Sequence, residues 1–298
     1  MRHHRGPIAA TLLAGLLWGS SFVVVKLGLR SIDPYWFVLL RFTTAAVVAV
    51  SYAAATGRLR VVGHLLRDPL VVWLGITNGI GFVFQFQGQT MTTAGKAALF
   101  VNSSTILVAI ASRFLFRERF TPAKGAAVVV GMAGVFLVTT GGSLRFTAGP
   151  ELVGDLLVIA GAVVWTAFIL LDKRIVESRE IDVRALTAAM VTVTALTALP
   201  VAIVLGDGGP PSLDARLWVV VYTALFCTVL PFLLWTWGLK SITATSSCVI
   251  LLVEIVFALA LAAVAFGERL TPGATVGAAL IVGAVLLVSR DTSPGGSQ

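Results

Sequence analysis

Charge, histidine and cysteine are all scarce in this chain. Charged residues make up 12% of its 298 residues, whereas soluble domains carry about 25%. This shortage argues against a water-soluble globule and against a disordered chain. The three histidines fall outside the long apolar segments, so no imidazole is expected inside them. The cysteines, Cys227 and Cys248, lie within apolar segments without ligand-like spacing, which predicts buried, reduced packing residues rather than a disulfide or metal site.

Apolar residues dominate instead, at 57% of the chain. A membrane-spanning helix needs about 20 apolar residues, so ten would use about 200 and leave no room for an extramembrane domain. The apolar runs are continuous, unlike the alternating strands of a membrane barrel. The sequence therefore predicts an all-α integral membrane protein with ten transmembrane helices. We expect these helices at residues 8–28, 35–55, 69–88, 95–116, 122–141, 153–171, 183–205, 215–235, 244–266 and 273–290.

An internal repeat is visible in the sequence. FRERFTP at 116–122 returns as FGERLTP at 266–272, an offset of 150 residues. The ten runs match as five and five, which predicts repeats over 1–145 and 146–298 within one membrane domain. Because each repeat crosses the membrane an odd number of times, the second repeat is inverted. Transporters use inverted repeats to open a central site to either face of the membrane.

The basic residues support this topology. With the N-terminus in the cytoplasm, fifteen of the 22 Lys and Arg residues lie inside, and seven lie outside or in outer half-spans. The connection 113–124 carries four basic residues, whereas its repeat mate 263–274 carries only Arg269. We therefore expect both termini in the cytoplasm, with 113–124 inside and 263–274 outside. The net charge of +8 reflects this topology, and no nucleic-acid partner is expected.

Four short motifs then occur in a characteristic order. They are LLWGSSFVVVK at 16–26, LRFTTAA at 40–46, TTAGKAALF at 92–100 and LVEIVFALALAAVAFGERLTP at 252–272. Together they resemble the drug/metabolite transporter superfamily, specifically its ten-helix exporters built from two EamA-type repeats. The resemblance covers nearly the whole chain and implies a membrane transporter for small solutes.

The chain departs from this family pattern at two positions. Thr105 and Ile255 stand where the family usually has proline. Proline removes a backbone donor and kinks a helix, so its absence predicts straighter fourth and ninth helices. Elsewhere the pattern has a structural explanation: Thr121 and Thr271 are expected to N-cap the following helices, each with proline at the first helical position. Small residues at Gly15–Gly19 and Gly273–Gly277 are expected to allow close helix packing.

Polar and aromatic side chains within the apolar runs are the candidates for a substrate site. Trp18 and Trp165 occupy equivalent positions in the two halves, Gln85 shares a helical face with Asn78, and Trp235 replaces Gln85 in the second half. Helix packing and interhelical hydrogen bonding explain these residues equally well. We expect a central cavity lined by both halves, with these substrate-binding residues: Trp18, Asn78, Gln85, Asn102, Trp165, Trp235 and Glu254.

Charged residues near the spans have two interpretations. Glu254 lies deep inside an apolar run, and intramembrane acids are rare and usually functional; we expect it to bind substrate, a proton or both. The alternative is a structural acid hydrogen-bonded to Ser, Asn or Lys of a neighbouring helix, with Lys26 or Lys96 as the pairing lysine. Those two lysines and Arg41 are expected near the outer interface, where long stems snorkel, rather than at the substrate.

The combined interpretation is a bacterial inner-membrane secondary transporter that exports a small polar or amphipathic metabolite, by proton antiport or facilitated exit. We expect a small-molecule substrate, lipid contact, a monomer or homodimer, and no cofactor, metal or ATPase subunit. An intramembrane enzyme is an alternative, but HExxH and paired Asp-rich motifs are absent from the sequence. A membrane sensor or scaffold without solute flux is the other alternative.

Overall fold

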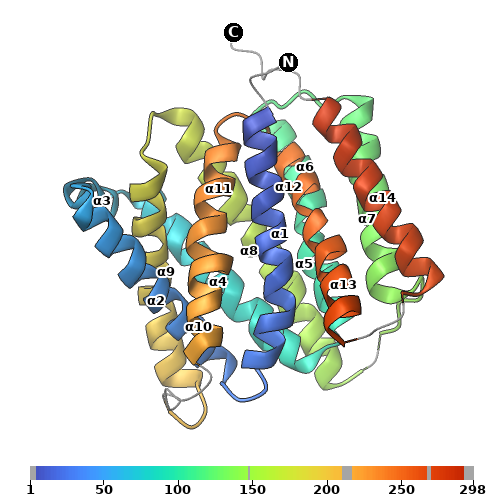
Figure 1. The fold of residues 1–298 in the computed structure, drawn as a ribbon, viewed down its shortest axis with the longest axis horizontal. Coiled ribbons are helices and arrows are strands. Elements are labelled where there is room, and N and C mark those ends of the chain that lie inside the picture. Colours follow the sequence, from blue (N-terminus) through green and yellow to red (C-terminus); the bar gives the residue numbers. More distant parts are fainter. Residues whose placement is uncertain (1–4, 147, 210–216, 267–269, 292–298) are drawn as a thin grey trace.

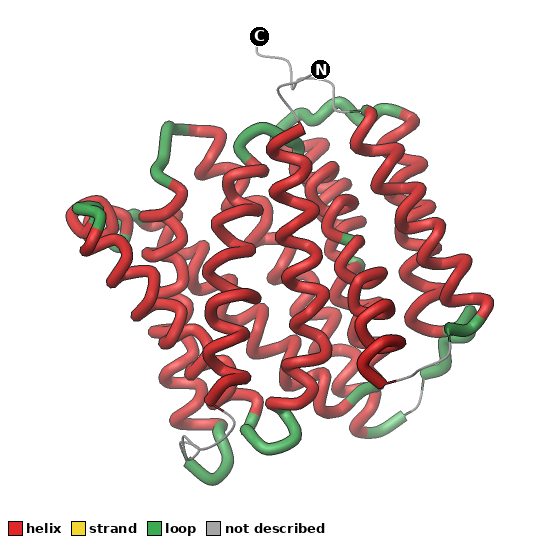
Figure 2. The backbone as a smooth tube through the Cα atoms, viewed as in Figure 1, coloured by secondary structure: helices red, strands yellow, loops and turns green. Residues whose placement is uncertain are grey.

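The computed structural model describes residues 5–146, 148–209, 217–266 and 270–291, without the side chains of Lys26, Ala94, Ala265 and Phe266. Arg2, Arg216 and Arg269 therefore lie outside the described residues. The part described is helical and contains no strand (Figures 1 and 2). Its elements are α1 (Arg5–Gly28), α2 (Pro34–Ala55), α3 (Leu59–Leu65), α4 (Pro69–Met91), α5 (Ala94–Asn102), α6 (Ser104–Leu115), α7 (Pro122–Thr140), α8 (Pro150–Ser178), α9 (Val183–Leu205), α10 (Leu217–Ala224), the π-helix η1 (Leu225–Val229), α11 (Leu230–Leu239), α12 (Ala244–Leu251), α13 (Val253–Phe266) and α14 (Pro272–Arg290).

Ten segments of the described chain are long and apolar enough to cross a membrane, which confirms the expected all-α membrane fold. The fourth span consists of α5 and α6, the eighth of α10, η1 and α11, and the ninth of α12 and α13. The short helix α3 connects the second and third spans. The expected N-caps are also confirmed: Thr121 Oγ1 accepts from Lys124 N at 3.1 Å, and Thr271 Oγ1 accepts from Ala274 N at 3.2 Å.

The prediction of straighter fourth and ninth helices is wrong. Each span is interrupted at an equivalent position, between α5 and α6 at Ser103 and between α12 and α13 at Leu252. At both points the backbone tightens into an i→i+3 turn, with Ile106 N bonded to Ser103 O and Ile255 N bonded to Leu252 O. A break in these helices therefore does not require proline.

The two halves pack with a reciprocal pattern. The first span of each half lies against the third span of the other, so α1 packs on α11 and α4 packs on α8. The fifth spans, α7 and α14, pack on each other at Gly134 and Gly277, where a Cβ on Gly277 would lie 2.6 Å from Gly134 O. Gly273 has open space around it, so the expected close contact holds for Gly277 alone of that pair.

Helix α1 begins and helix α14 ends at the same end of the bundle (Figure 1); we call this the terminal end, and the other the opposite end. The loop between α6 and α7 lies at the terminal end, because Thr121 Oγ1 is hydrogen-bonded to Asp291 beyond the last helix. The α14 helix begins at Pro272, one helix length away from that residue. The start of α7 and the repeat-equivalent start of α14 therefore lie at opposite ends of the bundle.

Candidate functional site

A cavity of about 720 Å³ lies in the middle of the bundle between the two halves. Its wall includes the C-terminal parts of α1, α4 and α7, the whole length of α5, and α13 from Glu254 to Ala262. Residues such as Arg30, Thr139 and Ala262 bring the wall to the opposite end, whereas Trp235 and Cys248 lie on its wall towards the terminal end. The cavity therefore runs from mid-bundle to the opposite end.

Six of the seven residues proposed from the sequence lie on this wall: Trp18, Gln85, Asn102, Trp165, Trp235 and Glu254. Asn78 does not. Its Nδ2 donates to Thr194 Oγ1 at 3.0 Å, in the buried contact between α4 and α9. Helical spacing places Asn78 on the same face as Gln85 but two turns closer to the terminal end, where α9 covers α4. Gln89, one helical turn beyond Gln85 on the same face of α4, does line the cavity.

Aromatic side chains from both halves form one continuous cluster in the cavity wall. Trp18 contacts Phe232 and Trp235 edge to face, with ring centroids 5.3 and 6.0 Å apart. Phe168 joins this group to Trp165, at centroid distances of 5.7 Å from Trp235 and 5.3 Å from Trp165. Such pairs contribute about 0.5–1.5 kcal/mol each beyond their buried area. The wall is therefore a rigid aromatic surface suited to an apolar or cationic group.

The tryptophan N–H groups are also fixed by hydrogen bonds. Trp165 Nε1 donates to Gln85 Oε1 at 3.1 Å, and Trp235 Nε1 donates to Ser247 Oγ at 2.7 Å. Trp18 Nε1 donates to the backbone carbonyl of Cys227 at 3.1 Å. Each of these three tryptophans therefore both packs against neighbouring side chains and lines the cavity.

The Cys227 carbonyl oxygen is free to accept side-chain hydrogen bonds because the residue four positions later is a proline. In an α-helix this oxygen would accept from the N–H of residue 231, but Pro231 has none. The chain accommodates the loss in the π-helix η1, a conformation found mostly as single turns at functional sites. Arg41 Nη2 also donates to Cys227 O, at 2.5 Å, and Arg41 Nε donates to Thr228 Oγ1 at 2.7 Å.

The expectation that Arg41 lies at the outer interface is wrong. Its side chain is 1% exposed, and its guanidinium lies over the Phe82 ring, with Cζ 4.8 Å from the ring centroid. Arg41 is also part of the cavity wall. The sequence pattern did not indicate this position, because a basic residue in an apolar run is typical of the membrane boundary. The signal that would have found it is Pro231, which leaves a carbonyl oxygen in need of a donor.

Glu254 is at the break of the ninth span, in the first turn of α13. Its Oε1 accepts a hydrogen bond of 3.4 Å from Asn102 Nδ2, the last residue of α5. Lys96 is not its partner: Lys96 Nζ pairs with Glu151 at 2.8 Å and Asp155 at 3.0 Å. The side chain of Lys26 lies outside the part described. The carboxyl group of Glu254 thus faces the cavity beside an amide from the other half.

Glu254 is not the only carboxyl group within a span. The sixth span was expected to end at residue 171, but α8 continues to Ser178 and includes Asp172. Asp172 is 1% exposed, and its Oδ2 accepts from Thr236 Oγ1 at 2.8 Å. The sequence pattern did not indicate Asp172, because the charged residues from 172 onwards are typical of a helix end.

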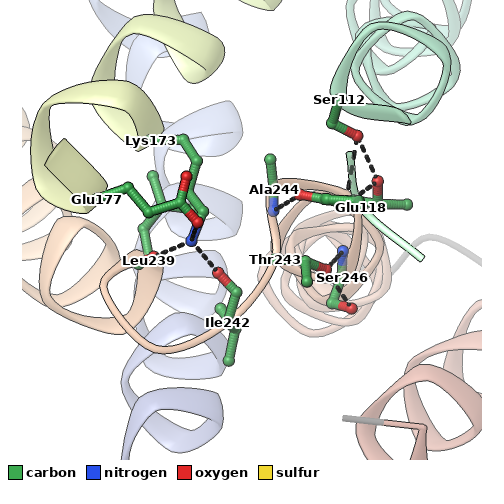
Figure 3. Close-up of polar contacts among 10 residues, drawn as sticks. Ser112, Glu118, Lys173, Glu177, Leu239, Ile242, Thr243, Ala244 and Ser246 are labelled. Atoms are coloured by element: carbon green, nitrogen blue, oxygen red, sulfur yellow. Dashed lines mark hydrogen bonds and ion pairs between the residues drawn. The ribbon is translucent and has the colours of Figure 1, made fainter. Parts of the chain in front are cut away.

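At the terminal end of the bundle a buried carboxylate joins the loop before α7 to the start of α12 (Figure 3). Glu118, in the loop between α6 and α7, accepts from Ala244 N at 2.7 Å and from Thr245 Oγ1 at 2.8 Å. Ser112 Oγ is a third partner at 3.3 Å. Ala244 is the first residue of α12, so a negative charge lies at the N-terminus of that helix, where the helix dipole favours it.

A second contact at this end holds the loop between α11 and α12 (Figure 3). Lys173 Nζ, on α8, donates to the backbone carbonyls of Leu239 at 3.0 Å and Ile242 at 2.9 Å. Its ion pair with Glu177 measures 3.3 Å. Glu118 therefore holds the first residue of α12, and Lys173 holds the loop that precedes it. Both contacts are at the terminal end of the bundle.

Comparison with known proteins gives a consistent result. A model of the EamA-like transporter family matches residues 5–140 and again residues 152–290. An uncharacterized transporter of Archaeoglobus fulgidus is 25% identical over 280 residues, which cover 93% of this chain and 95% of that protein. A probable terminal-alkyne amino-acid exporter of Streptantibioticus cattleyicolor is 29% identical over 290 residues, or 95% of this chain and 93% of the relative. An uncharacterized inner membrane transporter of Escherichia coli (strain K12) is 25% identical over 295 residues, which cover 95% of this chain and 90% of that protein.

The fold is also similar to a solved one. A protein of known crystal structure superposes with a TM-score of 0.79, at 22% sequence identity, over 94% of this chain and 95% of the other. At this identity the similarity concerns the fold alone.

Proposed function

Because the chain belongs to the EamA-like transporter family, we propose that it is a secondary transporter that exports a small amphipathic metabolite through the central cavity. The observation that carries the proposal is the cavity itself, which is lined by described residues of both halves and runs from mid-bundle to the opposite end. A volume of about 720 Å³ suits a small solute, since ligand pockets measure roughly 300–1,000 Å³.

The lining supports an amphipathic solute. Trp18, Phe168 and Trp235 offer apolar aromatic surface, while Gln85 and Glu254 offer polar groups on the same wall. The name of the Streptantibioticus relative, a probable amino-acid exporter, is consistent with a substrate of this kind. Substrate choice in such a fold depends on a few side chains in the pocket.

We propose that transport proceeds by alternating access between the two ends. The cavity wall extends to the opposite end, and the contacts of Glu118 and Lys173 at the terminal end support a closed state there. Opening the terminal end requires the bonds from Ala244 and Thr245 to Glu118 to break. In the alternate state, the inverted arrangement of the halves would allow the opposite end to close in turn.

We also propose that Glu254 couples transport to protons. A carboxyl group that faces the cavity can bind either a proton or a cationic part of the substrate. Competition between the two would give antiport, because the site takes up a proton when the substrate leaves. Its neutral neighbour Asn102 can donate to Glu254 while the acid is charged and accept from it when protonated.

For the orientation, we propose an inner-membrane protein with both termini in the cytoplasm, as the distribution of basic residues indicates. Thiol labelling of Arg117→Cys and Leu270→Cys variants tests it. Labelling of position 117 from the cytoplasm and of position 270 from outside is expected. Labelling of both positions from the same face would contradict the inverted arrangement.

A metabolite-export screen tests the proposed function. The chain is overexpressed in a bacterial host, and metabolites in the medium are compared with those from a strain that expresses Ala258→Trp. Ala258 lies on the cavity wall, so the indole ring fills the cavity without altering the closed end. We expect at least one small amphipathic metabolite to accumulate outside with the wild type alone. Identical media from the two strains would contradict the proposal.

A further inference from the structure

Arg41 is a buried cation whose partners in the structure are all neutral. Its two hydrogen bonds go to a carbonyl oxygen and a hydroxyl group, and its guanidinium lies over the Phe82 ring. Among the described residues, no carboxylate forms an ion pair with it. Leaving a buried charge unpaired costs several kcal/mol, so such groups are normally paired with a counter-ion.

Lys96 shows how the same chain treats a cation that has a structural role. Lys96 is also buried within a span, but it is neutralised by two carboxylates, Glu151 and Asp155. Arg41 has no such pair, although it lies on the cavity wall. The difference indicates that the counter-ion of Arg41 is not a residue of the described chain.

We propose that Arg41 is the subsite of the cavity that binds the carboxylate of the substrate. The inference rests on the proposed function and deepens it. A guanidinium carries five N–H donors in a planar fork that matches a carboxylate. Thr228 and Cys227 engage two of these donors, and the other three have no hydrogen-bond partner among the described residues.

The surroundings of Arg41 fix the orientation of the fork. Thr228 Oγ1, which receives the Nε bond, itself donates to Thr223 O at 2.9 Å, so its lone pairs face Arg41. The Phe82 ring stacks against the guanidinium plane, and the π-helix η1 presents the Cys227 carbonyl. The subsite is thus preorganised, which lowers the entropic cost of binding.

Glu254 supplies the complementary charge on the same cavity wall. A cavity with a guanidinium, a carboxyl group and aromatic rings fits a zwitterion with an apolar side chain. Arg41 would bind its carboxylate, Glu254 its ammonium group, and the aromatic cluster its side chain. A carboxylate is expected to be required even where the ammonium group is absent.

Binding of three probes to the purified full-length protein tests the proposal. L-phenylalanine carries both charges, N-acetyl-L-phenylalanine carries the carboxylate alone, and L-phenylalaninamide carries the ammonium group alone. We expect the wild type to bind both carboxylates at least about tenfold more tightly than the amide, as the strength of charge-assisted hydrogen bonds implies. Arg41→Gln should remove this preference and leave the affinity for the amide unchanged.

Two further variants separate recognition from folding. Arg60→Gln removes the same charge from an exposed position on α3 and should leave all three affinities unchanged. Thr228→Val keeps the shape of the side chain but removes the acceptor of the Arg41 Nε bond. It should weaken binding of both carboxylates roughly threefold without affecting the amide, even if Arg41→Gln fails to fold.

The outcomes are distinct. No carboxylate preference in the wild type, absence of measurable carboxylate binding included, would overturn the subsite. An equal loss for all three probes in Arg41→Gln and Thr228→Val would likewise overturn it, since that pattern indicates a structural role. A wild type that exports other solutes without any preference for carboxylates would retain the proposed function and exclude this subsite.

Discussion

Asn102 Nδ2 lies 3.4 Å from Glu254 Oε1, and this contact joins the broken helices of the two halves. Asn102 is the last residue before the break in the fourth span, and Glu254 is the second residue after the equivalent break in the ninth. The only intramembrane acid on the cavity wall among the described residues thus lies where the two repeats meet. A change in its charge would act on both halves.

Glu254→Gln is expected to fold normally and to lose the pH dependence of transport. Glutamine keeps the shape and the acceptor for Asn102 but cannot bind a proton. Flux measured in proteoliposomes between pH 6 and pH 8, roughly the range in which a proton-coupled carrier operates, checks this prediction. The control is Glu180→Gln, an exposed carboxyl group in the loop before α9. A Glu254→Gln variant with wild-type rate and pH profile would make the residue structural.

Gly19→Ala is expected to destabilise the protein, because α1 lies against the break in the ninth span. A Cβ at residue 19 would be 2.5 Å from the backbone oxygen of Glu254 and 3.1 Å from Phe257 Cβ. Overpacking of this kind costs about 1–3 kcal/mol. Gly273→Ala is the matched control, since nothing lies within 4 Å of its added Cβ. Thermal unfolding in detergent should separate the two variants; equal midpoints would contradict the close approach.

Glu118→Gln is expected to open the terminal end more often. The amide can still accept from Ala244 N, but it loses the charge at the N-terminus of α12. Loss of charge-assisted bonding of about 1–2 kcal/mol would raise the open population roughly tenfold. Labelling of Cys248 on the cavity wall, by an impermeant maleimide added to inside-out vesicles and followed by mass spectrometry, reports the opening.

Glu177→Gln is the control for this closure. Its side chain is 47% exposed and pairs with Lys173, which keeps its two carbonyl contacts without it. We expect labelling close to wild type. Equal labelling of Cys248 in the wild type and in Glu118→Gln would show that the carboxylate does not hold the terminal end closed.

Asp182 is expected to stabilise the protein at neutral pH but not in acid. It N-caps α9, accepting from Arg184 N at 2.9 Å, and it pairs with Arg58 at 2.7 Å. Partial burial alone would raise the pKa of Asp182, but the Arg58 bond and the backbone amides lower it overall. A lowered folded-state pKa gives stabilisation that is present above about pH 4 and is lost as the pH falls further.

Thermal unfolding of two Asp182 variants checks this pH dependence. Asp182→Ala removes both cap and ion pair and should cost about 1–2 kcal/mol at pH 7. Asp182→Asn keeps the cap, so its cost should be below about 1 kcal/mol. The difference between Asp182→Ala and the wild type should shrink as the pH approaches 3. A difference that stays constant with pH would contradict the ion pair.

The fold could be predicted from the sequence because the bilayer imposes its own rules. Span length follows from membrane thickness, and the caps at Thr121 and Thr271 follow from backbone donors that the helix leaves free. The breaks at Ser103 and Leu252 could not be predicted in this way. The fourth span packs against α8 and the ninth against α1, and local sequence does not encode these tertiary contacts.

The site was less predictable, because a helical pattern gives the direction of a side chain but not its depth. Asn78 and Gln85 share a face, yet α9 covers one and the cavity exposes the other. Arg41 was misplaced because its partners are the Cys227 carbonyl and Thr228, 186 and 187 residues away in the chain. Contacts of that separation are set by tertiary packing alone.

Solute flux through the purified protein tests the central claim most directly. Proteoliposomes are loaded with a mixture of cellular metabolites, and the compounds released over time are measured by mass spectrometry. We predict that wild-type protein releases at least one small amphipathic solute faster than protein-free liposomes do, and that Ala258→Trp, which fills the cavity, abolishes this release. Release at the protein-free rate, or equal release by Ala258→Trp, would contradict transport through the central cavity.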